Sequence, residues 1–137
     1  MQLSLLQHAA RWLLGIFLLL AGIGHLTWAR AEFQAQVPRW LPLEADLVVL
    51  HSGFVEIGLG LALLLLKSRR QQVGWALALF FLLIFPGNIS QYINKVDAFG
   101  LNSDTTRLIR LFFQPVLMVW ALWCTGALTG RKKQLAD

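Results

Sequence analysis

The sequence predicts an all-α membrane protein, a four-transmembrane-helix bundle whose N- and C-termini are both cytoplasmic. Hydrophobic residues make up 57% of its 137 residues, and they gather in four long apolar runs separated by short basic clusters. Charged residues make up 14%, against about 25% in an ordinary soluble domain. So few charges could not cover the surface of a small water-soluble protein. We therefore expect residues 1–137 to form a single domain in a lipid bilayer.

Each apolar run is long enough to cross a membrane, because roughly 20 helical residues span a hydrocarbon core of about 30 Å. The predicted spans cover residues 9–27, 47–66, 73–93 and 108–128. None alternates polar and apolar residues, as the strands of a β-barrel would. Arg11 before the first run and Ala29-Arg30-Ala31 after it are also compatible with a cleavable secretory signal. Because this run carries glycines and a histidine suited to helix packing, we expect a retained span.

The lysines and arginines that flank the runs predict the orientation. One side holds seven of them, Arg11, Lys67, Arg69, Arg70, Arg131, Lys132 and Lys133. The other side holds four, Arg30, Arg39, Lys95 and Arg107. The side with seven lysines and arginines is expected to be cytoplasmic. We therefore expect a multi-pass protein of the cell inner membrane. The net charge of +5 arises from these flanking clusters. We therefore expect the basic residues to face the lipid bilayer and not to bind nucleic acid.

Polar residues inside the spans are the candidate functional residues, because an ionisable group in lipid costs a few kcal/mol or more unless it is paired or hydrated. They lie in the outer half of the predicted bundle or at its midplane. The candidate ligand-binding residues are His25, His51, Ser52, Glu56, Asn88, Gln91, Tyr92, Arg110 and Gln114. Helical spacing puts several of them on shared faces, which are Ser52 with Glu56, Asn88 with Gln91 and Tyr92, and Arg107 with Arg110 and Gln114. If all these faces point into the bundle, they form one polar pocket, which we expect to open toward the outside of the cell.

Glu56, near the midplane, is the deepest charge and the candidate catalytic residue. Arg110 is the best candidate for its partner, because the two side chains can reach toward each other; His51 or His25 could instead share its proton. A plainer interpretation stays open, in which a Glu56–Arg110 pair only fixes the register of the helices. Two histidines and one glutamate without regular ligand spacing predict no metal site.

Two sequence features are expected to shape the outer half of the bundle. Pro86 and Pro115 should kink their helices and release the carbonyls of Leu82 and Leu111. The longest loop contains the segment 37–42, which reads VPRWLP. This segment either caps the mouth of the bundle or carries a simple interfacial tryptophan anchor.

Several of these segments resemble the motifs of the DoxX-like family of small four-helix bacterial membrane proteins. AGIGH at 21–25 is similar to its glycine-plus-histidine signature, VPRWLP to its proline-rich loop, and SGFVEIGLG at 52–60 to its most recognisable stretch. FPGNI at 85–89 and RLFFQ at 110–114 are similar to the motifs of its last two spans. The sequence departs at Gly87, where the family usually has alanine, and at Phe112, where proline is common. The resemblance implies a four-helix inner-membrane protein, and some relatives belong to thiosulfate:quinone oxidoreductase or membrane-linked redox assemblies.

Three functions fit these features. The first is a redox-associated subunit that binds a quinone or another small amphiphile, since the acid–base and amide groups suit the carbonyl oxygens of a quinone head group. Cys124 is the only cysteine and no haem or cluster motif is present, so a membrane or soluble redox partner would supply electrons, and enzyme activity stays an open question. The second is a non-enzymatic assembly or accessory protein. The third is a small proton-coupled transporter, which at this length would require a homo-oligomer.

Overall fold

The computed structural model describes residues 2–97 and 103–128, in which every regular element is helical. The elements in order are α1 (Leu5–Leu26), α2 (Arg30–Phe33), η1 (Gln34–Gln36), α3 (Ala45–Leu65), η2 (Lys67–Arg69), α4 (Arg70–Ile93) and α5 (Asp104–Cys124). Helices α1, α3, α5 and the continuous η2–α4 segment are each long and apolar enough to cross a membrane. The prediction of an all-α chain with four such spans is confirmed.

The ends of α1 and α5 differ from the predicted spans because capping and turn residues, and not apolar residues, set them. Helix α1 begins four residues early, where Ser4 and Gln7 form a capping box. Helix α5 also begins four residues early, with Ser103 and Thr106 in the same arrangement. It ends at Cys124 and not at residue 128, because the backbone turns at Gly126, which has a φ of 74°.

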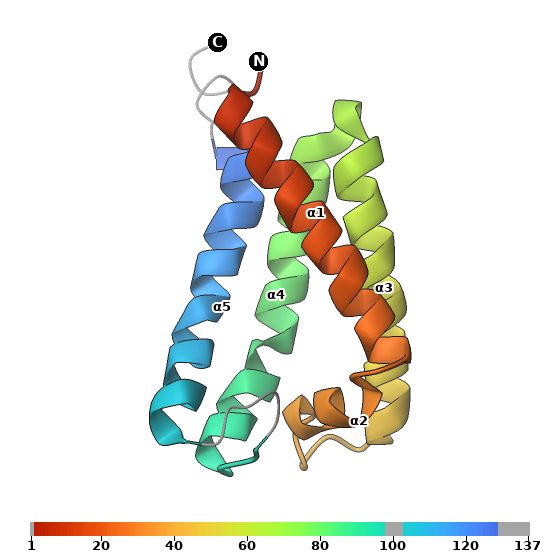
Figure 1. Ribbon diagram of the computed structural model, residues 1–137, viewed down its shortest axis with the longest axis vertical. Coiled ribbons are helices and arrows are strands. Elements are labelled where there is room, and N and C mark those ends of the chain that lie inside the picture. The colour runs from red at the N-terminus through yellow and green to blue at the C-terminus, as the bar shows by residue number, and fades with distance from the viewer. Residues whose placement is uncertain (1, 98–102, 129–137) are drawn as a thin grey trace.

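The bundle consists of two helix pairs, α1 on α3 and α4 on α5 (Figure 1). The start of α1 and the end of α5 lie at one end, together with η2 (Figure 1). Helix α2 lies at the opposite end, where α1 finishes and α3 begins (Figure 1). We call these the η2 end and the α2 end of the bundle.

Glycines bring the backbones of α1 and α3 into direct contact. A Cβ added to Gly22 would lie 2.9 Å from the carbonyl oxygen of Gly53, and a Cβ added to Gly60 would lie 3.1 Å from that of Gly15. A Cβ added to Gly53 would lie 2.6 Å from the Cβ of His25. Small residues at such crossings let membrane helices approach closely. This glycine seam, formed by Gly15, Gly22, Gly53 and Gly60, fixes how polar side chains of the two helices face each other.

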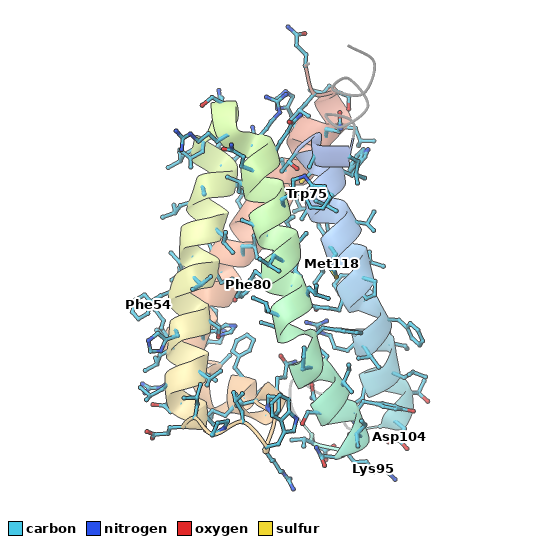
Figure 2. All side chains as sticks on the ribbon, turned by 180° about the vertical axis from the view of Figure 1, so that it is seen from behind. Phe54, Trp75, Phe80, Lys95, Asp104 and Met118 are labelled. Carbon is cyan, nitrogen blue, oxygen red and sulfur yellow. The ribbon has the colours of Figure 1, made fainter. Side chains whose placement is uncertain are left out.

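An apolar core fills the middle of the bundle and its η2 half. Its fully buried members include Leu14, Leu18, Leu63, Leu77 and Ala121. Large apolar side chains also cover the outside of the helices, as with Phe54, which projects from α3 and is 64% exposed (Figure 2). A bundle that is apolar inside and outside is expected where the surrounding solvent is lipid.

Candidate functional site

A cavity of about 620 Å³ lies between the two helix pairs toward the α2 end. This volume falls within the range of roughly 300–1,000 Å³ that is typical of small-molecule sites. Its wall is largely aromatic and aliphatic, with contributions from α1, α3, α4, α5 and the segment between α1 and α3. The polar side chains that line it are His25, Gln36, Ser52, Glu56 and Arg110.

His25 and Glu56 form a buried pair in this wall. The Nε2 atom of His25 lies 3.0 Å from Oε2 of Glu56, and both residues are less than a tenth exposed. Phe33 stacks on the imidazole ring, with 3.5 Å between ring centroids. Because the glycine seam joins α1 to α3 at this level, the pair is held by packing as well as by its hydrogen bond.

The other ring nitrogen of His25 contacts two groups of α3. Nδ1 of His25 lies 3.2 Å from the carbonyl oxygen of Val49 and 3.1 Å from Oγ of Ser52, and Ser52 donates its own proton to the Val49 carbonyl. The Ser52 hydroxyl can also donate to Nδ1, so these two contacts fit either tautomer of the ring. The distance between Nε2 and Oε2 is that of a hydrogen bond, which places one proton between His25 and Glu56. The pair is therefore an acid–base group that faces an apolar cavity.

Arg110 presents the cation of the cavity from α5. Its Nη1 donates to Oε1 of Gln114 at 3.0 Å, and the guanidinium carbon lies 6.0 Å from the centre of the Phe113 ring. The Gln114 amide in turn donates to the carbonyl of Phe81 on α4 at 2.7 Å. Gln114 thus orients Arg110 and ties α5 to α4.

The Gln114 contact lies next to the acceptor that Pro86 is expected to release. Pro86 lacks an N–H group, so the Leu82 carbonyl is expected to lose its helical donor. The donor from α5 reaches the carbonyl of Phe81, one residue earlier. A proline disturbs the helical ladder over the whole preceding turn, so a neighbouring carbonyl is also open to a side-chain donor.

The expected pairing of Glu56 with Arg110 is corrected. The two residues form no ion pair in the described part of the chain, and His25, one of the two alternatives, is the partner of Glu56. The physical reason is the spacing of the helices. Glycines close the gap between α1 and α3, whereas the cavity lies between Glu56 and Arg110, which both line it.

The remaining predicted site residues lie outside the cavity wall, so the expectation of one pocket for all the polar faces is corrected. His51 is exposed, and its Nδ1 contacts the Leu47 carbonyl within α3 at 2.8 Å. Tyr92 is half-buried. Asn88 is 3% exposed, and its Oδ1 has no hydrogen-bond partner among the described residues. Gln91 accepts a hydrogen bond from Gln36 and donates one to the backbone of the loop after α4, so its role is structural.

The segment between α1 and α3 lines the mouth of the cavity, which favours the capping interpretation of this loop. Val37, Pro38 and Leu41 contribute to the wall, and so does Trp40, although it remains 72% exposed. The proline and aromatic composition of VPRWLP pointed to this segment. No sequence signal pointed to Phe33 or Gln36, which contribute from α2 and η1.

Two further contacts hold this segment in place. Arg30 of α2 donates through Nε to Oδ1 of Asp46 at 2.7 Å and through Nη2 to Oδ2. The hydrogen bond to Asp46 raises the pKa of Arg30, so the pair remains charged at physiological pH. A Cβ added to Gly87 would lie 2.1 Å from the carbonyl oxygen of Gln36. Glycine is therefore required there for η1 to rest on α4.

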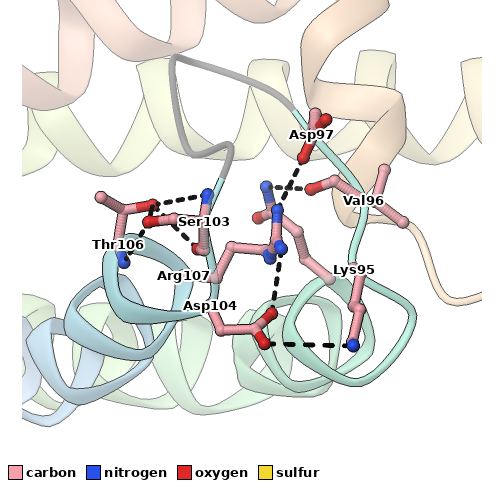
Figure 3. A network of polar contacts seen from close by, with 8 residues as sticks. Lys95, Val96, Asp97, Ser103, Asp104, Thr106 and Arg107 are labelled. Carbon is pink, nitrogen blue, oxygen red and sulfur yellow. Dashed lines mark hydrogen bonds and ion pairs between the residues drawn. The ribbon is translucent and has the colours of Figure 1, made fainter.

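Arg107 contacts residues in the loop after α4 and at the start of α5, and it does not line the cavity. It is 6% exposed and forms ion pairs with Asp97 at 2.6 Å and with Asp104 at 3.0 Å (Figure 3). Lys95 lies 4.0 Å from the same Asp104 (Figure 3). Arg107 shares a sequence stripe with Arg110, but it stabilises the start of α5.

The fold and the site together define a class, a four-helix protein with helices able to cross a membrane and an acid–base pair in a cavity between them. Residues 14–125 match the model of a family described as "Domain of unknown function (DUF8561)", and the chain belongs to that family. The matched region contains every polar residue of the cavity wall. No curated protein and no solved structure matches the chain.

Proposed function

We propose that this protein is a multi-pass inner-membrane protein that binds a quinone or a similar small amphiphile in the cavity near the α2 end, as a subunit that acts with a redox partner. One observation carries the proposal. The hydrogen-bonded pair of His25 and Glu56, with 3.0 Å between Nε2 and Oε2, faces an apolar cavity that also contains the cation of Arg110.

The chemistry of a quinone head group suits this arrangement. Each of its two carbonyl oxygens accepts hydrogen bonds, and Arg110 supplies N–H donors for one of them. The His25–Glu56 pair can give its shared proton to a reduced oxygen and take a proton back, as general acid–base catalysis requires. Electrons come from the partner, because the sequence contains no electron carrier of its own. Aromatic side chains such as Phe17, Phe80 and Phe113 form the apolar wall that a ring and its alkyl tail need.

The proposal also includes the orientation of the protein in the membrane and its relationship to the DoxX-like family. The distribution of lysine and arginine supports an α2 end that faces the outside of the cell and termini that face the cytoplasm. The DoxX-like resemblance supports a redox role, because His25, Glu56, Arg110 and Gln114 all lie in the similar segments.

Of the other two functions, a proton-coupled transporter is less well supported. A proton leaving Glu56 toward the η2 end meets a fully buried apolar core, which includes Leu14, Leu18 and Leu63. A non-enzymatic accessory role needs no ligand in the cavity at all. It therefore predicts that quinones leave the stability of the protein unchanged.

Thermal unfolding of the purified chain in mild detergent, titrated with decylubiquinone, tests the proposal. We expect the melting temperature to rise, since a ligand at about 100 times its Kd stabilises a fold by about 2.7 kcal/mol. Glu56→Gln and Arg110→Gln should each reduce this rise. His51→Gln is the matched control, because His51 is exposed and lies outside the cavity wall. An unchanged melting temperature at saturating quinone, or an equal rise in wild type and Glu56→Gln, contradicts the proposal.

A further inference from the structure

A second, smaller pocket lies at the η2 end of the bundle, far from the proposed quinone site. Its volume is about 320 Å³, and its lining comes from the start of α1 and from the turn between α3 and α4. The lining residues are Gln2, Leu3, His8, Arg11, Lys67 and Arg70. Three of the six are lysine or arginine, so the pocket is strongly basic. We call it the basic pocket.

Arg11 forms the floor of the basic pocket and is unusually buried for an arginine. It is 2% exposed. Its Nη1 donates to the carbonyl of Leu63 at 2.6 Å and more weakly to that of Leu64 at 3.4 Å, which caps the last turn of α3. Its Nε atom is buried and has no hydrogen-bond partner among the described residues. Because the carbonyl partners of Arg11 are uncharged, its positive charge at the pocket still calls for an anionic acceptor.

The acceptor is not a carboxylate from the described part of the protein. The described acidic residues are Glu32, Glu44, Asp46, Glu56, Asp97 and Asp104. Five of them lie in or next to the connections at the α2 end, and Glu56 is paired with His25 in the first cavity. The charges of Arg11 and Lys67 therefore meet no carboxylate in the described ranges, and a buried charge without a partner is costly.

We propose that the basic pocket binds the phosphate group of an anionic phospholipid. Phosphate oxygens accept strong charge-assisted hydrogen bonds from guanidinium and ammonium groups. Basic pockets between membrane helices at the interface bind such head groups. Exposed leucines flank the pocket, Leu66 beside Lys67 and Leu6 in the first turn of α1, and they provide apolar surface for the acyl chains. This site is independent of the quinone proposal.

Native mass spectrometry of the full chain in mild detergent tests the site. The probes are dioleoyl phosphatidylglycerol, dioleoyl phosphatidylcholine and inorganic phosphate. We expect phosphatidylglycerol to bind more tightly than phosphatidylcholine. Lys67→Gln should weaken phosphatidylglycerol binding about fivefold, since one basic residue near a membrane surface contributes about that much. Arg11 is left unchanged, because it also caps α3.

Arg69→Gln is the matched control. It removes the same charge at the same end of the bundle, but Arg69 does not line the basic pocket. We expect it to weaken binding less than twofold. Equal losses in Lys67→Gln and Arg69→Gln would overturn the proposal in favour of diffuse surface attraction. Equal binding of the two lipids would overturn it by showing that charge does not select the ligand. If inorganic phosphate displaces the lipid and its binding depends on Lys67, the ligand is soluble phosphate and not a lipid, and the proposal is overturned.

Discussion

Glu56 is stable at its depth in the bundle because His25 shares a proton with it. A carboxylate buried alone in an apolar medium would be costly, and it would neutralise by taking up a proton. The hydrogen bond between Nε2 and Oε2 gives this carboxyl group a partner. Val49 and Ser52 contact the other ring nitrogen, so the orientation of the imidazole is determined. Two residues 31 positions apart in the sequence thus act as one chemical group.

Substituting Glu56 tests this coupling. In Glu56→Leu the Nε2 atom of His25 loses its partner, so we expect the free energy of unfolding to fall by about 1–3 kcal/mol. In the double variant His25→Leu, Glu56→Leu neither group is left unpaired, and the loss should be smaller than the sum of the single losses. Denaturant unfolding in detergent measures both. Additive losses, or a Glu56→Leu variant more stable than wild type, would show that the pair is not coupled in this way.

The sequence pointed to four of the five polar side chains that line the cavity, all except Gln36, but not to which of them meet. Helical spacing places residues on one face of their own helix, and it correctly grouped Ser52 with Glu56. It says nothing about distances between helices, which depend on the glycine seam and on the cavity. From the sequence, only the length of the side chains indicates a partner for Glu56, and this criterion favours Arg110 over His25. Phe33, which stacks on His25, carried no sequence signal at all.

The α1–α3 helix pair depends on close backbone contact at the level of the site. A Cβ on Gly53 would lie 2.6 Å from the Cβ of His25 and 3.1 Å from the carbonyl oxygen of Gly22. Neither neighbour is the end of a flexible side chain, so the helices must move apart to accommodate a methyl group. Such a movement would displace His25 from Glu56.

Gly53→Ala is therefore expected to lower the free energy of unfolding by about 1–3 kcal/mol, the usual cost of overpacking. Gly58→Ala on the same helix is the matched control. A Cβ there meets nothing within 4 Å, so we expect no loss, or a gain of up to about 1 kcal/mol from higher helix propensity. Thermal unfolding of the two variants compares them directly. Equal effects of the two substitutions would show that the seam is not tightly packed.

At the scale of elements, the apolar runs predicted the existence of the helices better than their ends. An apolar run marks the part of a helix that can lie in lipid, whereas the starts of α1 and α5 follow from capping. Ser4 and Ser103 cap helices that begin four residues before the predicted spans. Both serines stand three residues before a side chain that completes a capping box, which is a signal visible in the sequence. The short helix α2 had no such signal.

For the whole molecule, the four spans could be predicted, but their arrangement in two pairs around a cavity could not. In a membrane protein the apolar residues facing lipid and those facing the core are alike. Leu18 is fully buried and Leu20 is 55% exposed, yet the two residues are chemically identical. Hydrophobic periodicity, which separates inside from outside in soluble helices, loses its value here. The positions of the polar residues and of the glycines are what indicates which faces of the helices are buried.

The orientation of the bundle can be tested by cysteine labelling in intact cells. In a Cys124→Ala background, Thr105→Cys places a thiol at the α2 end and Ser68→Cys places one at the η2 end, both at exposed positions. We expect a membrane-impermeant maleimide to label Thr105→Cys in intact cells, and Ser68→Cys only after permeabilisation. The reverse pattern would invert the orientation and place the cavity mouth in the cytoplasm.

The central claim is that His25, Glu56 and Arg110 share one cavity that holds a quinone-type amphiphile. An experimental density map of the protein with decylubiquinone in lipid nanodiscs tests it most directly. We predict ligand density between α3 and α5, with one carbonyl oxygen within hydrogen-bond distance of Arg110 and the head group next to the His25–Glu56 pair. A cavity occupied by acyl chains in the presence of saturating quinone, or Glu56 and Arg110 turned toward lipid, would contradict the account.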